Sequence, residues 1–224
     1  MIKCVVFDFD GTLVDSNEIK RETFFEVAHP WDPSGEIVTA VFERWPAADR
    51  YAKTRRIAEG LIDRKLLPAD SSLEEWAARL ADEYTARCEA AIAGCREMPG
   101  ATATLEKLSA MGLLLFINSA TPAIPLRQLT KLRNWAHLFR AVYGAEATKA
   151  ENLLSIAKAS AAERHEMVHV GDQLDDQSGA EQFGCHFVAM TSGIAESAVR
   201  KNPLLVEDLR DLPALLNKIS REAL

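Results

Sequence analysis

The 224-residue sequence predicts an α/β protein: a doubly wound parallel sheet, Rossmann-like, interrupted by an inserted all-helical domain. Three observations support this prediction. Short apolar runs bounded by Gly, Asp, Asn or Ser recur along the chain, and segments with helical periodicity lie between most of them. Residues 17–96, by contrast, contain helical patterns and no convincing strand.

Five apolar runs have the length and the flanking residues of buried parallel strands. They are Ile2–Phe9, Leu113–Asn118, Ala141–Tyr143, Met167–Val170 and His186–Met190. Ahead of the second run, Leu105, Leu108 and Met111 stand at helical spacing before Gly112, a residue type that often ends a helix. A further helix over 150–162 precedes the fourth run. This alternation of strand and helix in the second half of the chain indicates a doubly wound α/β sheet.

The inserted segment has three long amphipathic stretches, Glu18–His29, Ala47–Lys65 and Ser71–Ala93. The last one begins with a serine and two glutamates, which are typical of a helix N-terminus. The sequence Glu97-Met98-Pro99-Gly100 marks the return to the sheet. We therefore expect a core domain formed by residues 1–16 and 97–224 and a helical domain formed by residues 17–96.

The overall composition favours a globular protein, because 48% of the residues are hydrophobic and 26% are charged. A net charge of -7 disfavours nucleic acid as a partner. The apolar runs are too short to span a bilayer, and the N-terminus lacks the pattern of a signal peptide. The cysteines have no zinc-site spacing. We expect a cytoplasmic protein without a membrane partner, and the sequence does not indicate its oligomeric state.

Two carboxylates follow the first predicted strand. Asp8 and Asp10 are two residues apart, so on an extended backbone their side chains point to the same side. Gly11 allows an immediate turn and a close approach of the backbone to a ligand, and Thr12 adds a hydroxyl. Such a pair is either a turn with a helix cap or a functional site in which a cation or proton relieves the repulsion.

Polar residues also follow the next three strands, at the edge of the sheet where ligands bind in this fold class. Ser119, followed by Ala120, ends the second strand and can donate to a bound oxygen or cap a helix. Lys149 begins a helix, a position that is unfavourable for a cation unless an anion lies nearby. Asp172 and Asp176 follow the fourth strand, and their carboxylates favour a Mg²⁺ site.

These residues together resemble the motifs of the haloacid dehalogenase-like hydrolase superfamily, which consists mainly of phosphatases. Residues 8–16 resemble its first motif, Ser119 the second, Lys149 the third, and Asp172 with Asp176 the fourth. The helical insert resembles the cap domain of the phosphoglycolate phosphatase-like members, and the similarity covers essentially the whole chain. One departure is that plain helix follows Lys149, where many relatives have a proline-rich segment.

The resemblance implies a Mg²⁺-dependent phosphatase acting on a small organic phosphomonoester. Asp8 would be the nucleophile and form an aspartyl-phosphate, and Asp10 would be the general acid and base. Mg²⁺ would be bound by Asp8, by the backbone carbonyl of Asp10 and by Asp172. Asp176 would support the metal or orient Lys149.

The resemblance also implies how a phosphorylated metabolite would be held. Ser119, Lys149 and the backbone amides around Gly11 would bind the phosphoryl oxygens. Thr12 and Ala120 belong to the same predicted binding loops. In the helical domain, Lys20 and Arg50 either face the substrate or lie on a solvated helix surface. The histidines (His29, His137, His165, His169 and His186) are interpreted as structural or surface residues.

Three alternatives remain open at this point. A phosphomutase would use the same nucleophile but pass the phosphoryl group to a second hydroxyl. A metal-independent haloacid dehalogenase would use Asp8 to displace halide from carbon, which leaves Asp10, Asp172 and Asp176 without a purpose. A non-catalytic binding module would keep the fold but would not need both Asp8 and Asp10.

Overall fold

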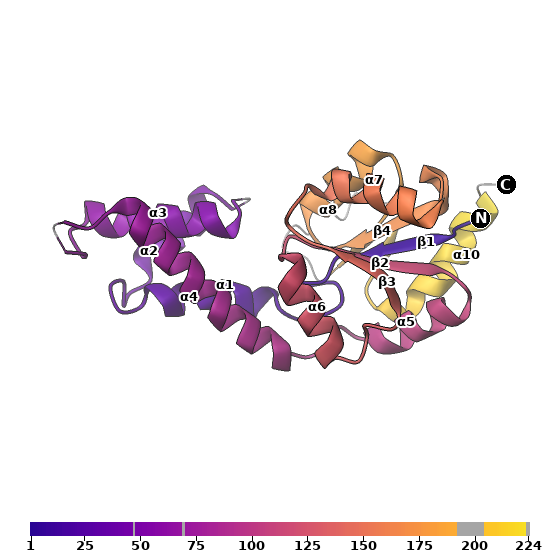
Figure 1. Ribbon diagram of the computed structural model, residues 1–224, viewed down its shortest axis with the longest axis horizontal. Helices are drawn as coiled ribbons and strands as arrows, with labels where there is room; N and C mark the ends of the chain where they lie inside the picture. The colour runs from indigo at the N-terminus through magenta and orange to yellow at the C-terminus, as the bar shows by residue number, and fades with distance from the viewer. Residues whose placement is uncertain (47, 69, 192–203, 223–224) are drawn as a thin grey trace. The chain divides into compact units, whose positions relative to one another are not determined.

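The computed structural model describes residues 1–46, 48–68, 70–191 and 204–222 (Figure 1). Its six-stranded sheet is parallel throughout and has the order β3-β2-β1-β4-β5-β6. The strands are β1 (Cys4–Phe7), β2 (Leu114–Asn118), β3 (Phe139–Tyr143), β4 (Met167–Gly171), β5 (His186–Met190) and β6 (Leu205–Val206). This arrangement confirms the predicted α/β fold class.

Helices cover both faces of the sheet. One face carries α7 (Lys149–Ser160) and α8 (Leu174–Phe183), and the other carries α5 (Ala101–Ala110) and α10 (Leu212–Glu222), as Figure 1 shows. All four residues of β1 are buried, so both of its faces need apolar side chains, and its sequence reads as a continuous apolar run. The remaining elements of this part are α6 (Ala123–Leu132) and the short 3₁₀ turns Arg164–Glu166 and Leu209–Asp211.

The chain divides into two compact units, a sheet unit formed by Met1–Ser16 with Cys95–Leu224 and a helical unit formed by Asn17–Gly94. Within the sheet unit, the segments that lead out to the helices and back again run side by side. The Asp15 amide donates to the Arg96 carbonyl over 2.9 Å, and the Met98 amide donates to the Leu13 carbonyl over 3.0 Å. These backbone bonds close the sheet unit where the insertion interrupts it.

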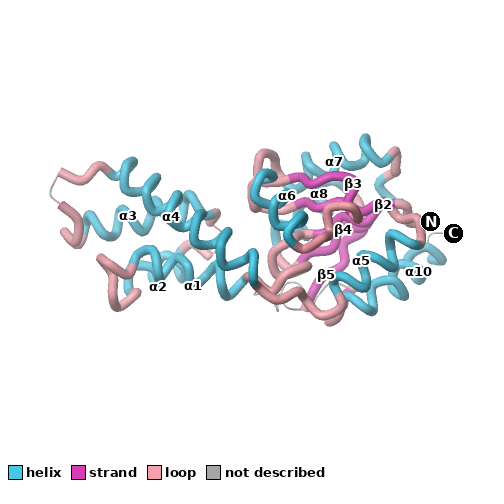
Figure 2. Tube along the Cα trace, turned by 60° about the horizontal axis from the view of Figure 1, so that its bottom comes forward, coloured by secondary structure: helices cyan, strands magenta, loops and turns pink. Residues whose placement is uncertain are grey.

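The helical unit consists of α1 (Asn17–Ala28), α2 (Glu36–Arg44), α3 (Arg50–Asp63) and α4 (Leu73–Gly94), shown as cyan tubes in Figure 2. Its core includes the ring of Phe24, whose centroid lies 4.1 Å from that of Tyr84 and 5.4 Å from that of Phe42. Lys53 is buried and donates to the carbonyls of Pro46 and Ala48, which fixes the turn before α3. Lys53 therefore has a structural role within this unit.

Several elements were not named from the sequence, among them α2, α6, α8, α10 and β6. The helix α2 contains several β-branched residues, which weaken a helical pattern. Its start is set by the buried carboxylate of Asp32, which accepts from the amides of Ile37 and Val38 over 2.9 and 3.2 Å. The strand β6 has only two residues, too few for a recognisable run. The predicted helix start at Ala47 lies outside the described residues. No helix among the described residues is both long and apolar enough to cross a membrane.

Replacing Asp32 tests this account of α2. The change Asp32→Ala removes the acceptor of two buried amides, and we expect it to lower the free energy of unfolding by about 1–2 kcal/mol. Urea unfolding followed by circular dichroism measures the change. The exposed Asp63→Ala, at the end of α3, is the control and should have little effect; equal losses in both variants would contradict the role assigned to Asp32.

Candidate functional site

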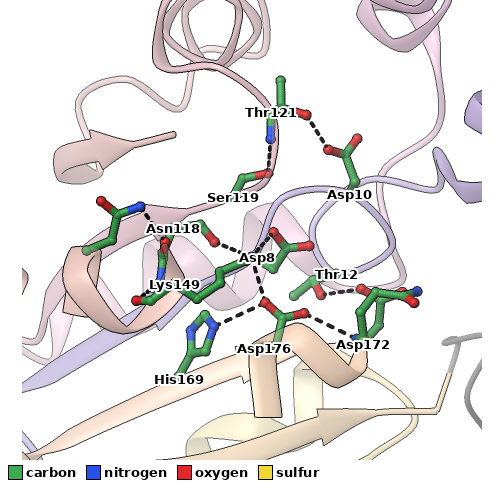
Figure 3. A network of polar contacts seen from close by, with 12 residues as sticks. Asp8, Asp10, Thr12, Asn118, Ser119, Thr121, Lys149, His169, Asp172 and Asp176 are labelled. Carbon is green, nitrogen blue, oxygen red and sulfur yellow. Dashed lines mark hydrogen bonds and ion pairs between the residues drawn. The ribbon is translucent and has the colours of Figure 1, made fainter. Parts of the chain in front are cut away.

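The candidate site lies at the carboxyl edge of the sheet, next to the point where the strand order reverses. The strands β1 and β4 are neighbours, whereas the chain leaves β1 toward β2 on the other side. Asp8 directly follows β1, and Asp172 directly follows β4, so the fold brings these two carboxylates together (Figure 3). Open parallel sheets place their ligands in this crevice.

The loop after β1 is folded tightly on itself. The amides of Leu13 and Val14 both donate to the carbonyl of Phe9, over 2.9 and 3.1 Å, and the amide of Gly11 donates to the carbonyl of Val14 over 2.8 Å. Gly11 has a φ of 75°, a conformation that is strained for other residues. This turn lets Asp8 and Asp10 follow the strand closely while the chain reverses direction.

Lys149 is the cation of the site. It is the first residue of α7, whose start is fixed by a capping box between Thr148 and Glu151. Its ammonium lies 2.7 Å from Asp8 Oδ1, 2.6 Å from Asp176 Oδ1 and 2.7 Å from the carbonyl oxygen of Asn118. An ammonium has three N–H donors, and these three acceptors match them. Asp8 and Asp176 are the anions that offset the cost of placing a lysine at a helix N-terminus.

The charges in this cluster shift one another's pKa values. Burial raises the pKa of Asp8 well above its usual range, and the nearby carboxylates Asp176, Asp172 and Asp10 raise it further against the opposing effect of Lys149. Burial alone would lower the pKa of Lys149, but Asp176 and Asp8 raise it above its usual range. Burial alone would raise the pKa of Asp176, but Lys149 and His169 hold it below its usual range. Lys149 and Asp176 are therefore a stable ion pair.

Three buried carboxylates of the site could hold a metal ion. Asp8, Asp172 and Asp176 each offer an oxygen, and these oxygens lie within 4.8 Å of one another. Around them, Thr12 Oγ1 donates to Asp172 Oδ1 over 3.4 Å and the side chain of Gln173 donates to Asp172 Oδ2 over 2.7 Å. Buried carboxylates in excess of one lysine are costly without further positive charge. An all-oxygen donor set suits a hard divalent cation.

Asp10 is held apart from this acidic cluster. Its Oδ1 accepts from the hydroxyl of Ser16 over 2.7 Å, and its Oδ2 accepts from the hydroxyl of Thr121 over 2.8 Å. Figure 3 shows the carboxylate of Asp10 directed toward Thr121 and not toward Lys149. Two neighbouring carboxylates of one loop are thus placed in different environments, one beside a cation and the other between hydroxyls.

The other predicted binding residues of the sheet unit have distinct surroundings. Ser119 is buried, and its hydroxyl oxygen accepts from the amide of Thr121 over 3.2 Å, so the hydroxyl proton is directed elsewhere. Ala120 is exposed beside it. The amide of Gly11 donates within its own loop, and the hydroxyl of Thr12 donates to Asp172. Both residues therefore hold the carboxylates of the site in place. Asp175 is exposed, unlike Asp172 and Asp176.

Two of the predicted residues belong to the helical unit. Lys20 lies in α1, and Arg50 is the first residue of α3. The guanidinium of Arg50 donates to Thr85 Oγ1 over 3.5 Å and lies 5.8 Å from the centroid of the Tyr84 ring. These contacts lie within the helical unit, and a role of either residue toward a substrate stays a prediction.

Several polar residues of the site were not singled out from the sequence. Asn118 donates from its side chain to the Lys149 carbonyl over 3.1 Å and accepts from the side chain of Asn152 over 3.0 Å. These two buried amides fasten the start of α7 to the end of β2. His169 and Thr121 are the other two additions. A polar residue inside an apolar strand, as at Asn118 and His169, is the signal that could have identified them.

A family model described as haloacid dehalogenase-like hydrolase matches residues 2–184. The phosphoglycolate phosphatase of Aliivibrio fischeri is 26% identical over 198 residues, which represent 86% of this chain and 85% of that protein. This similarity extends over both units of the chain.

Solved structures with a similar fold belong to proteins that are named for different activities. A predicted phosphoglycolate phosphatase from Haemophilus somnus 129PT has a TM-score of 0.76 at 18% identity, covering 96% of this chain and 97% of that chain. A 2-haloacid dehalogenase from Pseudomonas syringae pv. Tomato DC3000 has a TM-score of 0.63 at 23% identity, covering 97% and 99%. The fold is therefore shared, and the residues of the site must distinguish the reactions.

The packing around Asp176 depends on a glycine in β4. A Cβ atom at Gly171 would lie 2.3 Å from Asp176 Cγ, so Gly171→Ala must displace this carboxylate. We expect the free energy of unfolding to fall by about 1–3 kcal/mol. Thermal unfolding measures it, with Gly94→Ala as the control because a Cβ there meets no atom within 4 Å. Similar stabilities of the two variants would contradict this packing.

Proposed function

Because the chain belongs to the haloacid dehalogenase-like hydrolase family, as its motifs indicated, we propose that it is a phosphatase that hydrolyses a small organic phosphomonoester. The observation that carries the proposal is the contrast between its two motif carboxylates. Asp8 lies 2.7 Å from a lysine in an acidic cluster, whereas Asp10 lies between two hydroxyls. A nucleophile and a separate proton carrier need this division.

In the first half of the reaction, an Asp8 carboxylate oxygen attacks phosphorus and the bond from phosphorus to the ester oxygen breaks. Asp10 gives a proton to the departing alkoxide. In the second half, Asp10 takes a proton from water, whose oxygen attacks the aspartyl-phosphate. Phosphate leaves, and the carboxylate of Asp8 is restored.

The site residues also suit Mg²⁺, as the carboxylate chemistry at the strand ends predicted. Asp8 and Asp172 would hold the ion with the backbone carbonyl of Asp10, and Asp176 would support the ion or orient Lys149. When bound, the ion neutralises charge on the transferring phosphoryl group and lowers its repulsion with Asp8. Burial and the neighbouring carboxylates raise the pKa of Asp8, and the positive charge of a bound ion would oppose that rise.

The phosphoryl oxygens would be held by donors from the loop after β2 and by Lys149. The hydroxyl of Ser119 can donate to one of them because its oxygen already accepts from Thr121. The backbone amide of the exposed residue Ala120 is a candidate donor to another, and Lys149 contributes its charge. Donors fixed in this way stabilise the charge that develops on the phosphoryl group during transfer.

The substrate class follows from the relatives and from the insert. The A. fischeri relative is named a phosphoglycolate phosphatase, and phosphoglycolate is accordingly the first candidate among small phosphorylated metabolites. The helical unit would act as a cap, with Lys20 and Arg50 as candidate contacts to the substrate. A cytoplasmic location fits a metabolite of this kind.

The dehalogenase alternative is disfavoured by Asp10 and Asp172. Halide needs neither a proton nor a metal ion when it leaves carbon, yet Asp10 is held by two hydroxyls and Asp172 by two donors. Placing and orienting these buried carboxylates is costly and would serve no step of that reaction. A phosphomutase would share every residue discussed here and differs only in the acceptor of the phosphoryl group.

Replacing the nucleophile is the first test. We expect Asp8→Asn to abolish Mg²⁺-dependent phosphate release from an aryl phosphate or from phosphoglycolate, because the amide cannot attack phosphorus. Asp15→Asn is the matched control, since Asp15 lies seven residues along the same loop region and its carboxylate is exposed. Residual activity of Asp8→Asn comparable to that of the control would contradict the proposal.

Replacing Asp10 tests the division of labour. We expect Asp10→Asn to lower kcat by about 10²–10⁴-fold, the usual contribution of general acid–base catalysis. Stopped assays of phosphate release measure it. Substrates with good leaving groups need no proton, so their first half-reaction should suffer less. An equal loss of kcat/KM, which reports the first half-reaction, for good and poor leaving groups would contradict a proton-transfer role in that step.

Metal binding can be tested without turnover. We expect Mg²⁺ at 100 times its Kd to stabilise the protein by about 2.7 kcal/mol, and Asp172→Asn to remove most of this effect. The pKa of Asp8 is raised, so protons compete with the cation, and the Mg²⁺ affinity should increase as the pH rises. Thermal unfolding with Mg²⁺ and with EDTA measures both; no stabilisation at any pH would contradict the metal assignment.

A further inference from the structure

We propose that His169 is a positioning residue of the site, which holds Asp176 and through it Lys149 against Asp8. This inference rests on the proposed function, because it assigns a further residue to the same reaction. The sequence analysis interpreted His169 as structural, since it lies inside an apolar strand away from the strand ends. The contact of His169 with Asp176 connects this buried residue to Lys149 and, through Lys149, to Asp8.

His169 lies in β4 beside Val6 of β1 and is completely buried. Its Nδ1 lies 3.2 Å from the carbonyl oxygen of Val6, and its Nε2 lies 3.1 Å from Asp176 Oδ1. Both neighbours are hydrogen-bond acceptors, and the carboxylate of Asp176 is the stronger of the two, so Nε2 is assigned as the donor to it. The ring is therefore fixed at both ends, as Figure 3 shows on the side of Asp176.

A chain of polar contacts leads from His169 through Asp176 and Lys149 to the nucleophile Asp8. Asp176 Oδ1 receives the histidine and also Lys149, whose ammonium lies 2.6 Å away, and Lys149 contacts Asp8 over 2.7 Å. Asp8 and Val6 are two residues apart in the sequence, which returns these contacts to β1. Through Asp176, His169 therefore fixes the position of Lys149 relative to β1, the strand that Asp8 follows.

The second oxygen of Asp176 is fixed independently, by the amide of Gln173 over 3.2 Å. With both oxygens bound, rotation of this carboxylate would break contacts on two sides. Loss of the histidine donor would leave Oδ1 with Lys149 as its remaining contact from the sheet side. Lys149 could then follow Asp176 away from Asp8, and the nucleophile would lose its orientation.

If this position served only stability, an aliphatic residue would suit it better than a histidine. The neighbouring strand positions Val168 and Val170 are buried aliphatic residues, and the site of His169 is equally buried. Burying an imidazole costs free energy unless its nitrogens are hydrogen-bonded, whereas an aliphatic side chain carries no such cost. The donor to Asp176 is what an aliphatic side chain at this position could not supply.

Two amide substitutions separate the two ring nitrogens. In His169→Gln the side-chain amide reaches the place of Nε2 and can still donate to Asp176. In His169→Asn the shorter amide reaches the place of Nδ1 and can donate only to Val6. We expect His169→Asn to lower kcat by about 10–100-fold with a small change in KM, because the substrate contacts remain. We expect His169→Gln to recover most of kcat.

The outcome of this comparison decides the proposal. Equal kcat losses in the two folded variants, no loss in either, or a loss confined to KM would overturn it. Circular dichroism and thermal unfolding show whether both variants fold. Phosphate release by the unmodified protein is measured alongside, and its absence would count against the proposed function and not against the contacts of His169.

A second measurement uses the unmodified protein and needs no folded variant. With ¹⁵N-labelled histidine, NMR spectra of the Mg²⁺-loaded protein should show a proton on Nε2 of His169, exchanging slowly with solvent. A ring nitrogen without a proton on the side of Asp176 would overturn the proposal, because that nitrogen could not donate to the carboxylate.

Discussion

The contact of the Lys149 ammonium with three oxygens is the interaction on which the site depends. It joins four elements, since Lys149 begins α7, Asp8 follows β1, Asn118 ends β2 and Asp176 lies in α8. Each element reaches this point for its own reason: the strands because parallel pairing aligns their carboxyl ends, and α7 because its capping box fixes where the helix begins. The lysine connects them.

The same contact leaves the site short of positive charge. Lys149 compensates Asp176, whose pKa is held low, but it does not compensate Asp8, whose pKa is raised by burial and by the other carboxylates. Such a site favours the binding of a cation, and it suits a reaction in which negative charge develops on a bound phosphoryl group. Asp10 adds to the negative charge around Asp8, but its own oxygens accept from Ser16 and Thr121 and not from Lys149, which suits it to proton transfer.

Much of the fold and of the site could be predicted from the sequence, because β1 and the motif after it are local features. Asp8, Lys149 and Asp172 stand out as polar residues at strand ends, and the fold brings them together. The positions of Asn152, Thr121 and His169 could not be predicted in this way. Their roles depend on side-chain directions across neighbouring elements, such as the placing of His169 beside Val6 by strand register. The helix α2 was missed because a buried cap at Asp32 outweighs its β-branched residues.

The central claim is that Asp8 carries the phosphoryl group during the reaction. Rapid acid quenching of the protein with Mg²⁺ and a ³²P-labelled phosphomonoester, followed by peptide mapping, tests it most directly. We predict label on the peptide that contains Asp8, and more of it in Asp10→Asn, whose second half-reaction is slowed. Turnover without label on the protein, or label on another residue, would contradict the claim.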